Sequence, residues 1–365
     1  MADAIVAYAA QDPTVVGVVG TGRDLKSSRR TTGTLMEAGL PVVSGTNSAT
    51  YLPIEYANWF SLAATDEWQS KQLGLIARQL RTTGAKQYAL VLARDTAGTD
   101  DLYTAEQARY GQQMLKDQGF TLLQQRRYTL RGGRPELRLH TEEICQGGNV
   151  PSVIYFAGRV EDVDPLMTQL GNAPGCADQD IAVLTGDDLS KARFTSGGEA
   201  VAPKVTLYHA ALADLEGAAS LTTFYEDTKA LPNVGPQGLS HDAPALASGQ
   251  TALVHDATRA LYWAATAKAP TARAATAKAG TARAASPSRA ATWVNLRTVE
   301  LPGMATGTID FTDAPLYKDR TGHSVVLKEV RRAKDGAITS RVLCSRIAGD
   351  SRPLTEEECA IDEPG

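Results

Sequence analysis

The chain has 365 residues, of which 43% are hydrophobic and 21% charged, and its formal net charge is −4. This is the composition of an ordinary globular protein with enough length for two domains. The weak negative charge excludes a general attraction to nucleic acid, and no apolar run is long enough to cross a bilayer. The first residues lack a basic segment before an apolar one, so we expect no signal segment in this chain.

Apolar runs alternate with amphipathic stretches along the first half of the chain. Strands separated by helices of about 10–15 residues predict βαβ units and an α/β fold with mostly parallel sheets. A longer helix follows the third strand, and Asp66 is its predicted N-cap. The expected helices are 4–11, 29–38, 66–82, 101–118, 135–145 and 160–170, and the expected strands are 15–20, 41–44, 59–64, 88–93, 121–125, 152–158 and 181–186.

The second half of the chain has a different pattern of predicted elements. A crossing strand at 203–210 and helices at 215–229 and 244–265 are followed by three strands with the alternation of antiparallel pairs. These strands are 308–311, 324–331 and 338–344, with turns at 319–322 and 335–336.

Residues 264–292 form a low-complexity insertion, in which TAKAPTARAA is followed by TAKAGTARAA. The stretch is basic and has no acidic residue, which is compatible with a tail that binds a polyanion. It also lacks large apolar side chains to bury, which is typical of a solvated loop. We favour the loop and predict no nucleic-acid partner.

The four cysteines contain no C-x-x-C pair, and the chain has only five histidines, so neither a metal site nor a cofactor is expected. Two disulfides, Cys145–Cys176 and Cys344–Cys359, would fit an oxidising compartment. Four unpaired thiols in a cytosolic protein are the alternative, because pairing does not follow from sequence alone. We favour the disulfides.

Two early strands each end in a turn rich in glycine and hydroxyl groups. VVGVVG leads into TGRDLKSS, and LPVVS leads into GTNSAT. Ligands of open α/β sheets bind outside the carboxyl ends of the strands, and such turns suit a small anion such as a carboxylate. The first turn is not a phosphate-binding loop, because Arg23 stands where that motif requires lysine. No nucleophile with a neighbouring base is present, which favours binding over catalysis.

Charged residues follow two later strands. Asp187 and Asp188 come directly after 181–186, where they can pair with a ligand ammonium or cap the next turn. Arg159 follows 152–158, where it can meet a ligand carboxylate or face solvent.

The ordered set of segments resembles the type 1 periplasmic binding proteins, specifically the leucine/isoleucine/valine-binding receptors of ABC transporters. The segments that carry the resemblance are VVGVVGTGRDLKSS, LPVVSGTNSATYL, WFSLAATDEWQSKQLGLIARQL, YALVLARD, VIYFAGRVEDVDPLMTQL and IAVLTGDD, followed by the return helices and the closing strands. The resemblance implies two doubly wound domains joined by hinge crossovers, with the ligand bound between them. The expected division is 1–65 with 208–320, and 66–207 with 321–365.

By position, the resemblance implies a set of ligand-binding residues. Lys26 or Ser27 falls near the carboxylate-binding serine of the family, and Asp188 matches the acid that pairs with the ligand ammonium. Arg159 stands where an aromatic residue is common, which favours a more polar or anionic ligand over leucine, or a loss of binding. The full set is Lys26, Ser27, Thr46, Ser48, Tyr103, Arg159 and Asp188.

The resemblance also bears on function. It implies an extracytoplasmic receptor, periplasmic or anchored at the cell surface, that passes an amino acid or related metabolite to an ABC permease without altering it. A sensor or orphan binding domain of the same fold is one alternative, and an enzyme that uses Asp187, Asp188 and His209 is another. Family members begin with a strand–helix–strand unit that has no counterpart before 4–11, so we expect domain 1 to lack it.

Overall fold

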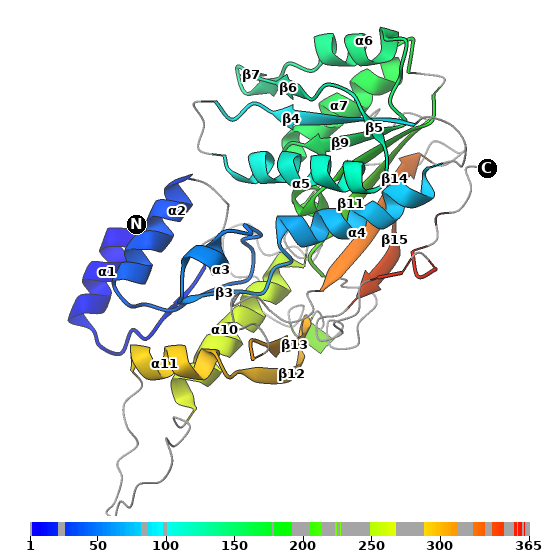
Figure 1. Ribbon diagram of the computed structural model, residues 1–365. Coiled ribbons are helices and arrows are strands. Elements are labelled where there is room, and N and C mark those ends of the chain that lie inside the picture. The colour runs from blue at the N-terminus through cyan, green and yellow to red at the C-terminus, as the bar shows by residue number, and fades with distance from the viewer. Residues whose placement is uncertain are drawn as a thin grey trace, which may run out of the picture.

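The chain folds into a mixed α/β structure around two main sheets (Figure 1). The computed structural model describes residues 2–20, 26–81, 87–97, 101–176, 179–191, 204–213, 223–224, 227, 249–267, 288–312, 324–332, 338–346, 354–355, 357–359 and 361. The expected helix at 215–229, the repeat at 268–287 and the two turns of the closing strands lie largely or wholly outside these residues. Within them, no helix is both long and apolar enough to cross a membrane.

The smaller sheet has three parallel strands in the order β1-β2-β3. Neighbouring side chains on each strand face opposite ways. Val42 and Trp59 pack with α1 and α2, while Val43 and Phe60 pack with α10 on the other face. The elements are α1 (Ala2–Gln11), β1 (Val18–Val19), α2 (Lys26–Glu37), β2 (Val42–Ser44), α3 (Leu52–Glu55), β3 (Trp59–Ser61) and α10 (Gln250–Thr266).

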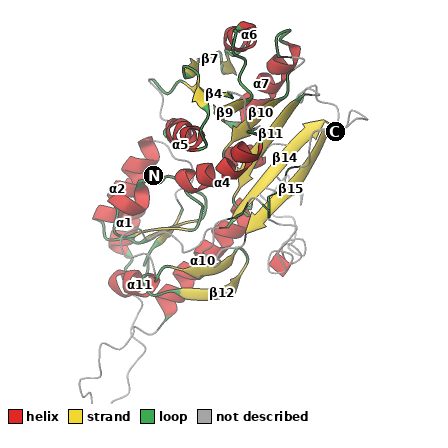
Figure 2. Ribbon diagram, turned by 45° about the vertical axis from the view of Figure 1, so that its right-hand side comes forward, coloured by secondary structure: helices red, strands yellow, loops and turns green. Residues whose placement is uncertain are grey.

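The larger sheet has eight strands in the order β15-β14-β11-β10-β9-β4-β5, with β6 also paired to β4. All its pairings are parallel except those of β14 with β11 and with β15, which lie side by side at one edge (Figure 2). The strands are β4 (Tyr88–Arg94), β5 (Thr121–Leu122), β6 (Arg126–Tyr128), β9 (Val153–Ala157), β10 (Ile181–Thr185), β11 (Val205–Ala211), β14 (Val325–Arg332) and β15 (Ile338–Arg346).

Helices cover both faces of the larger sheet, as a doubly wound fold requires (Figure 1). Val91 and Tyr155 face the core that includes α4 and α5, whereas Leu92 and Phe156 face the core under α6 and α7. This explains the unbroken apolar runs of β4 and β9, because a strand buried on both faces has no solvent side. The helices are α4 (Asp66–Gln79), α5 (Tyr103–Asp117), α6 (Arg138–Gln146), α7 (Val160–Asn172) and the 3₁₀ turn η1 (Asp187–Lys191).

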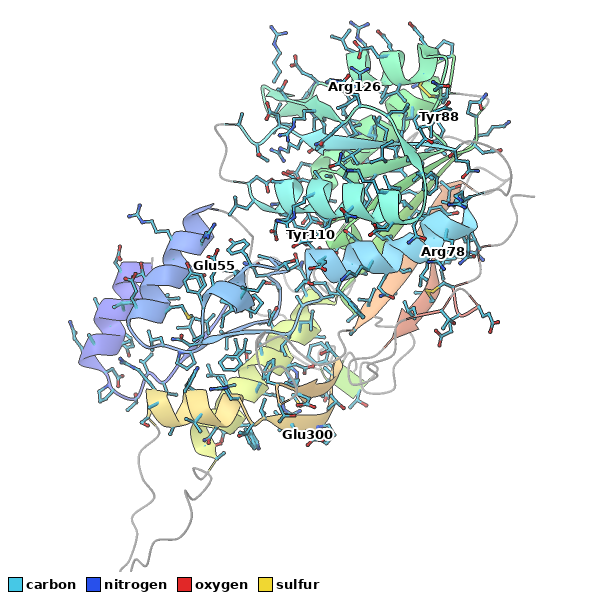
Figure 3. The ribbon with its side chains drawn as sticks, viewed as in Figure 1. Glu55, Arg78, Tyr88, Tyr110, Arg126 and Glu300 are labelled. Atoms are coloured by element: carbon cyan, nitrogen blue, oxygen red, sulfur yellow. A yellow bond between two sulfur atoms is a disulfide. The ribbon has the colours of Figure 1, made fainter. Side chains whose placement is uncertain are left out.

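The remaining elements are two short hairpins and a short helix. Glu300 on one of these hairpins is exposed, as is Arg78 on α4 (Figure 3). The elements are the hairpin of β7 (Leu130–Arg131) with β8 (Arg134–Pro135), α11 (Arg289–Leu296), and the hairpin of β12 (Glu300–Met304) with β13 (Gly307–Asp310).

The structure corrects some expected boundaries. Thr65, not Asp66, is the N-cap of α4, and its hydroxyl accepts the N–H of Trp68 at 3.3 Å. The stretch 135–145 is not one helix, because Pro135 ends the β7–β8 hairpin and α6 begins only at Arg138. The low-complexity stretch 264–292 is helical at both ends, since α10 ends at Thr266 and α11 begins at Arg289.

The division into two domains stays a prediction. The strand β11 crosses the expected boundary at 207/208 and remains in the larger sheet, pairing with β10 and β14.

Both expected disulfides are present. Cys145 at the end of α6 bonds to Cys176 in the turn after α7, and Cys344 on β15 bonds to Cys359. Each bond closes a loop in the unfolded chain and so stabilises the fold through the entropy of that state.

Candidate functional site

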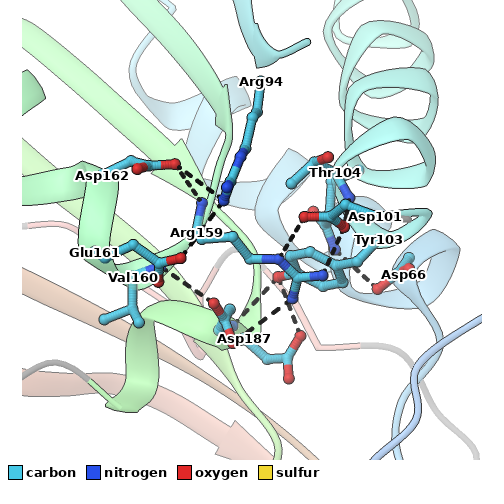
Figure 4. A network of polar contacts seen from close by, with 12 residues as sticks. Asp66, Arg94, Asp101, Tyr103, Thr104, Arg159, Val160, Glu161, Asp162 and Asp187 are labelled. Carbon is cyan, nitrogen blue, oxygen red and sulfur yellow. Dashed lines mark hydrogen bonds and ion pairs between the residues drawn. The ribbon is translucent and has the colours of Figure 1, made fainter. Parts of the chain in front are cut away.

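Polar side chains gather where three neighbouring strands of the larger sheet end (Figure 4). The strands β4, β9 and β10 are parallel neighbours, so their carboxyl ends lie at one edge. Arg159 follows β9, Asp187 and Asp188 follow β10, and the segment after β4 leads to Tyr103 at the start of α5. The topology thus explains why residues far apart in the sequence meet here.

Arg159 contacts three other residues at this edge. Its guanidinium donates to the Asp101 carboxylate from Nε at 2.9 Å and from Nη2 at 2.6 Å. It lies over the ring of Tyr103, with Cζ 4.4 Å from the centroid, and Nη1 is 3.9 Å from Asp188. Burial disfavours the charged form of Arg159, but the hydrogen bonds and charge of Asp101 outweigh it and raise its pKa. The side chain is therefore a permanent buried cation.

The Tyr103 hydroxyl connects the residues that follow β10. It donates to Asp187 Oδ1 at 3.3 Å and accepts the backbone N–H of Asp188 at 3.2 Å. Burial, together with the nearby carboxylates of Asp187 and Asp188, raises the pKa of Tyr103 well above its usual value. The phenol is therefore protonated at any physiological pH.

The Asp188 carboxylate accepts a hydrogen bond from the protein backbone. Its Oδ2 accepts the backbone N–H of Val160 at 3.1 Å, at the first residue of α7. A carboxylate at a helix N-terminus satisfies a free N–H group and interacts favourably with the helix dipole. The sequence allowed an acid at this position to cap the turn that follows it, whereas the structure places Asp188 at the N-terminus of α7, the helix after β9.

A second group of buried polar side chains joins α4 to α5. Gln107 donates to Asp66 Oδ1 at 2.9 Å and accepts from the hydroxyl of Tyr155 on β9. Tyr155 also exchanges a hydrogen bond of 2.9 Å with Ser70, and Gln69 accepts the N–H of Asp187 at 3.0 Å. Because these side chains are buried, each bond also avoids the cost of an unpaired polar group.

The turn after β2 reaches the same network. The Ser48 carbonyl accepts the N–H of Asp66 at 2.9 Å, and the N–H of Thr50 donates to Glu106 of α5 at 3.1 Å. Asn47 fixes the turn by accepting the N–H of Ala49 at 3.0 Å, while its buried Nδ2 has no partner in the part of the chain that the structure describes. The turn from the smaller sheet is thereby hydrogen-bonded to the first turns of α4 and α5.

The predicted site residues fall into three groups. Tyr103, Arg159 and Asp188 are in mutual contact. Ser48 and the half-buried Thr46 lie on the turn after β2, and the Ser48 carbonyl accepts the N–H of Asp66. Lys26 and Ser27 begin α2, and their side chains lie outside the described residues.

Sequence reasoning missed several members of the network. Asp101, Gln69, Gln107 and Asn47 were not expected in it, although Gln107 lies one helical turn after Tyr103. Spacing on α5 could have indicated that residue.

His209 gives no support to an enzyme at this edge. It is buried on β11 and pairs with Thr185 of β10 in the sheet register. Its Nδ1 donates a hydrogen bond to the carbonyl of Ala210 at 2.9 Å. Burial lowers the pKa of His209 to about 4, so the ring is neutral. No group of three or more histidine, cysteine or acidic side chains in the described residues is arranged to hold a metal ion.

The fold is that of the type 1 periplasmic binding proteins, and the resemblance drawn from the sequence is confirmed at this level. The leucine-binding protein LivK of Thermotoga maritima matches with a TM-score of 0.62 and 16% identity, over 96% of this chain and 85% of that one. The isoleucine complex of LivJ from Streptococcus pneumoniae matches with a TM-score of 0.60 and 17% identity, over 93% and 83%.

A third solved structure has a different ligand. It is a solute-binding protein of an ABC transporter from Rhodopseudomonas palustris, in complex with 3,4-dihydroxybenzoic acid. Its TM-score is 0.62 and its identity 12%, over 95% of this chain and 83% of that one. No protein-family model and no curated protein matches the sequence. At sequence identities this low, the three solved structures show the fold of this chain and not its ligand.

Proposed function

We propose that this protein is an extracytoplasmic receptor that binds an amino acid or a related small polar metabolite and delivers it to an ABC permease. The observation that carries the proposal is that the turn after β2 is hydrogen-bonded to the first turns of α4 and α5, and that α5 begins among the polar side chains at the ends of β4, β9 and β10. Ligands of open α/β sheets bind at such strand ends.

The groups at this edge are suited to binding rather than to chemistry. Tyr103 is a protonated phenol, Arg159 is a permanent cation, and the turn after β2 carries backbone N–H groups and the amide of Asn47. These groups donate or accept hydrogen bonds, and none of them is a nucleophile with a base beside it. The bound solute would leave unaltered.

The solved structures of the same fold support the class of ligand. Those named above are a leucine-binding protein, a protein bound to isoleucine and a protein bound to 3,4-dihydroxybenzoic acid. A carboxyl group is common to these three small molecules. Placement outside the cytoplasm agrees with the two disulfides, which persist in oxidising compartments.

A thermal-shift screen of amino acids and small organic acids tests the proposal. A solute present at 100 times its Kd stabilises the native state by about 2.7 kcal/mol, which is readily measured. The variant Tyr103→Phe should weaken the best compound about five-fold, for the loss of one hydrogen-bonding hydroxyl.

Tyr88→Phe is the matched control, because Tyr88 begins β4 and lies at the opposite end of that strand (Figure 3). A shift that depends on Tyr103 and not on Tyr88 supports the site. Absence of any shift across the screen would contradict the proposed function.

A further inference from the structure

We infer that Arg159 fills the position in which the site would otherwise receive a cationic group of the solute, so that the solute is a carboxylic acid without an ammonium group. The inference rests on the proposed function and specifies its ligand. It assigns to Arg159 the choice between amino acids and their deaminated analogues.

The first ground is that three acids at the edge, Asp101, Asp187 and Asp188, already have donors from the protein. Asp101 receives two hydrogen bonds from Arg159, and Asp188 receives the N–H of Val160 and lies 3.9 Å from Arg159 Nη1. Asp187 receives the hydroxyl of Tyr103. A ligand ammonium at this edge would have to share these carboxylates with the protein's own donors.

The second ground is that displacing the Arg159 side chain from this position would cost much free energy. Its side chain is 6% exposed, and breaking a buried ion pair leaves an uncompensated charge. It also cannot lose its proton to make room, since Asp101 raises its pKa. A second cation close to it would be repelled in this poorly solvated setting.

The third ground is a buried amide donor beside the edge, Asn47 Nδ2, next to a buried hydroxyl that can also donate. Asn47 Nδ2 and the Thr104 hydroxyl are buried and have no hydrogen-bond partner among the described residues. Asn47 lies in the turn after β2, and the backbone N–H of Thr104 donates to Asp101 at 3.3 Å. An amide N–H can only donate, so it matches a carboxylate oxygen and not an ammonium group.

Matched pairs of compounds test the inference. Calorimetric titrations compare L-leucine with 4-methylpentanoate and 2-hydroxy-4-methylpentanoate, and L-phenylalanine with 3-phenylpropanoate, benzoate and 3,4-dihydroxybenzoate. In the wild-type protein we expect the best acid without an ammonium group to bind at least about 100-fold more tightly than its amino-acid counterpart.

Variants of Arg159 give the second arm. Arg159→Gln combined with Asp101→Asn replaces the ion pair by a neutral pair, so that no buried charge is left alone at position 101. Asp188 can then receive an ammonium group, and the preference should shift toward the amino acid by at least about ten-fold. Arg159→Lys should keep the wild-type preference, as should the control Arg94→Gln, which removes a cation that pairs with Glu161 and Asp162 beside the same edge.

The outcomes separate the inference from the proposed function. Tighter binding of amino acids by the wild-type protein, or an unchanged preference in a folded double variant, would overturn the inference and leave the receptor function standing. A double variant that does not fold leaves the wild-type comparison to decide. Absence of binding by every compound to every protein would overturn both.

Discussion

The backbone N–H of Asp66 donates to the carbonyl of Ser48 at 2.9 Å, which joins the first residue of α4 to the turn after β2. The carboxylate of the same residue accepts from Gln107 on α5. One fully buried residue therefore connects the turn after a strand of the smaller sheet to α5, which packs on the larger one.

Removal of the Asp66 carboxylate should destabilise the fold. Asp66→Ala leaves the buried amide of Gln107 without its acceptor, and an unsatisfied buried donor costs about 1–3 kcal/mol. We expect a loss of about 2 kcal/mol in the free energy of unfolding, measured by urea denaturation. The adjacent Glu67, whose side chain is 39% exposed and pairs with Lys71, is the control, and Glu67→Ala should cost under about 0.5 kcal/mol. Equal effects of the two changes would contradict this role of Asp66.

Gly45 should tolerate no side chain. A Cβ at this position would lie 2.6 Å from the backbone carbonyl of Leu253 and 2.7 Å from the nitrogen of Val254, so α10 would have to move off the end of β2. We expect Gly45→Ala to destabilise by about 1–3 kcal/mol, as overpacking does. Gly33→Ala in α2 meets only ordinary contact with Tyr56 and should stabilise by about 0.5–1 kcal/mol. Thermal denaturation of both variants checks the opposite signs.

His209 should make stability depend on pH. In the native state burial lowers its pKa to about 4, against 6.5 for an exposed histidine. Between these values the unfolded chain binds a proton that the native chain does not, so the free energy of unfolding falls as the pH falls from 6.5 to 4. The contribution approaches about 1.4 kcal/mol per pH unit. His209→Asn should remove it, so the difference between wild-type and variant curves isolates this residue. Parallel curves would show that His209 does not titrate in this way.

The two disulfides should differ modestly in their contribution. Cys145–Cys176 spans 31 positions and Cys344–Cys359 spans 15, and loop-closure entropy predicts roughly 3.5 and 3 kcal/mol. Replacing each pair by alanines and comparing the midpoints of urea unfolding tests both values. Unchanged stability in either double variant would contradict the account for that bond.

The meeting of Tyr103, Arg159 and Asp188 could be predicted from the sequence because it depends on topology. Apolar runs such as VIYFAG and IAVLTG mark parallel strands, and residues that follow neighbouring parallel strands share one edge. The partner of Arg159 could not be predicted, because it depends on where the segment between β4 and α5 places Asp101.

Two errors have local causes. Thr65 and Asp66 can each cap a helix, so the sequence left the first residue of α4 ambiguous. The helix expected at 135–145 overlooked Gly132 and Gly133, which have φ of 57° and 79° and form the tight turn between β7 and β8. A Gly-Gly pair between short polar segments is a hairpin signal that was available in the sequence.

A crystal structure of the protein with the compound that gives the largest thermal shift would locate the solute. We expect unaltered solute at the strand ends, in contact with Tyr103 and with the turn that carries Asn47 and Ser48. Solute bound elsewhere on the molecule, or found only as a reaction product, would contradict it.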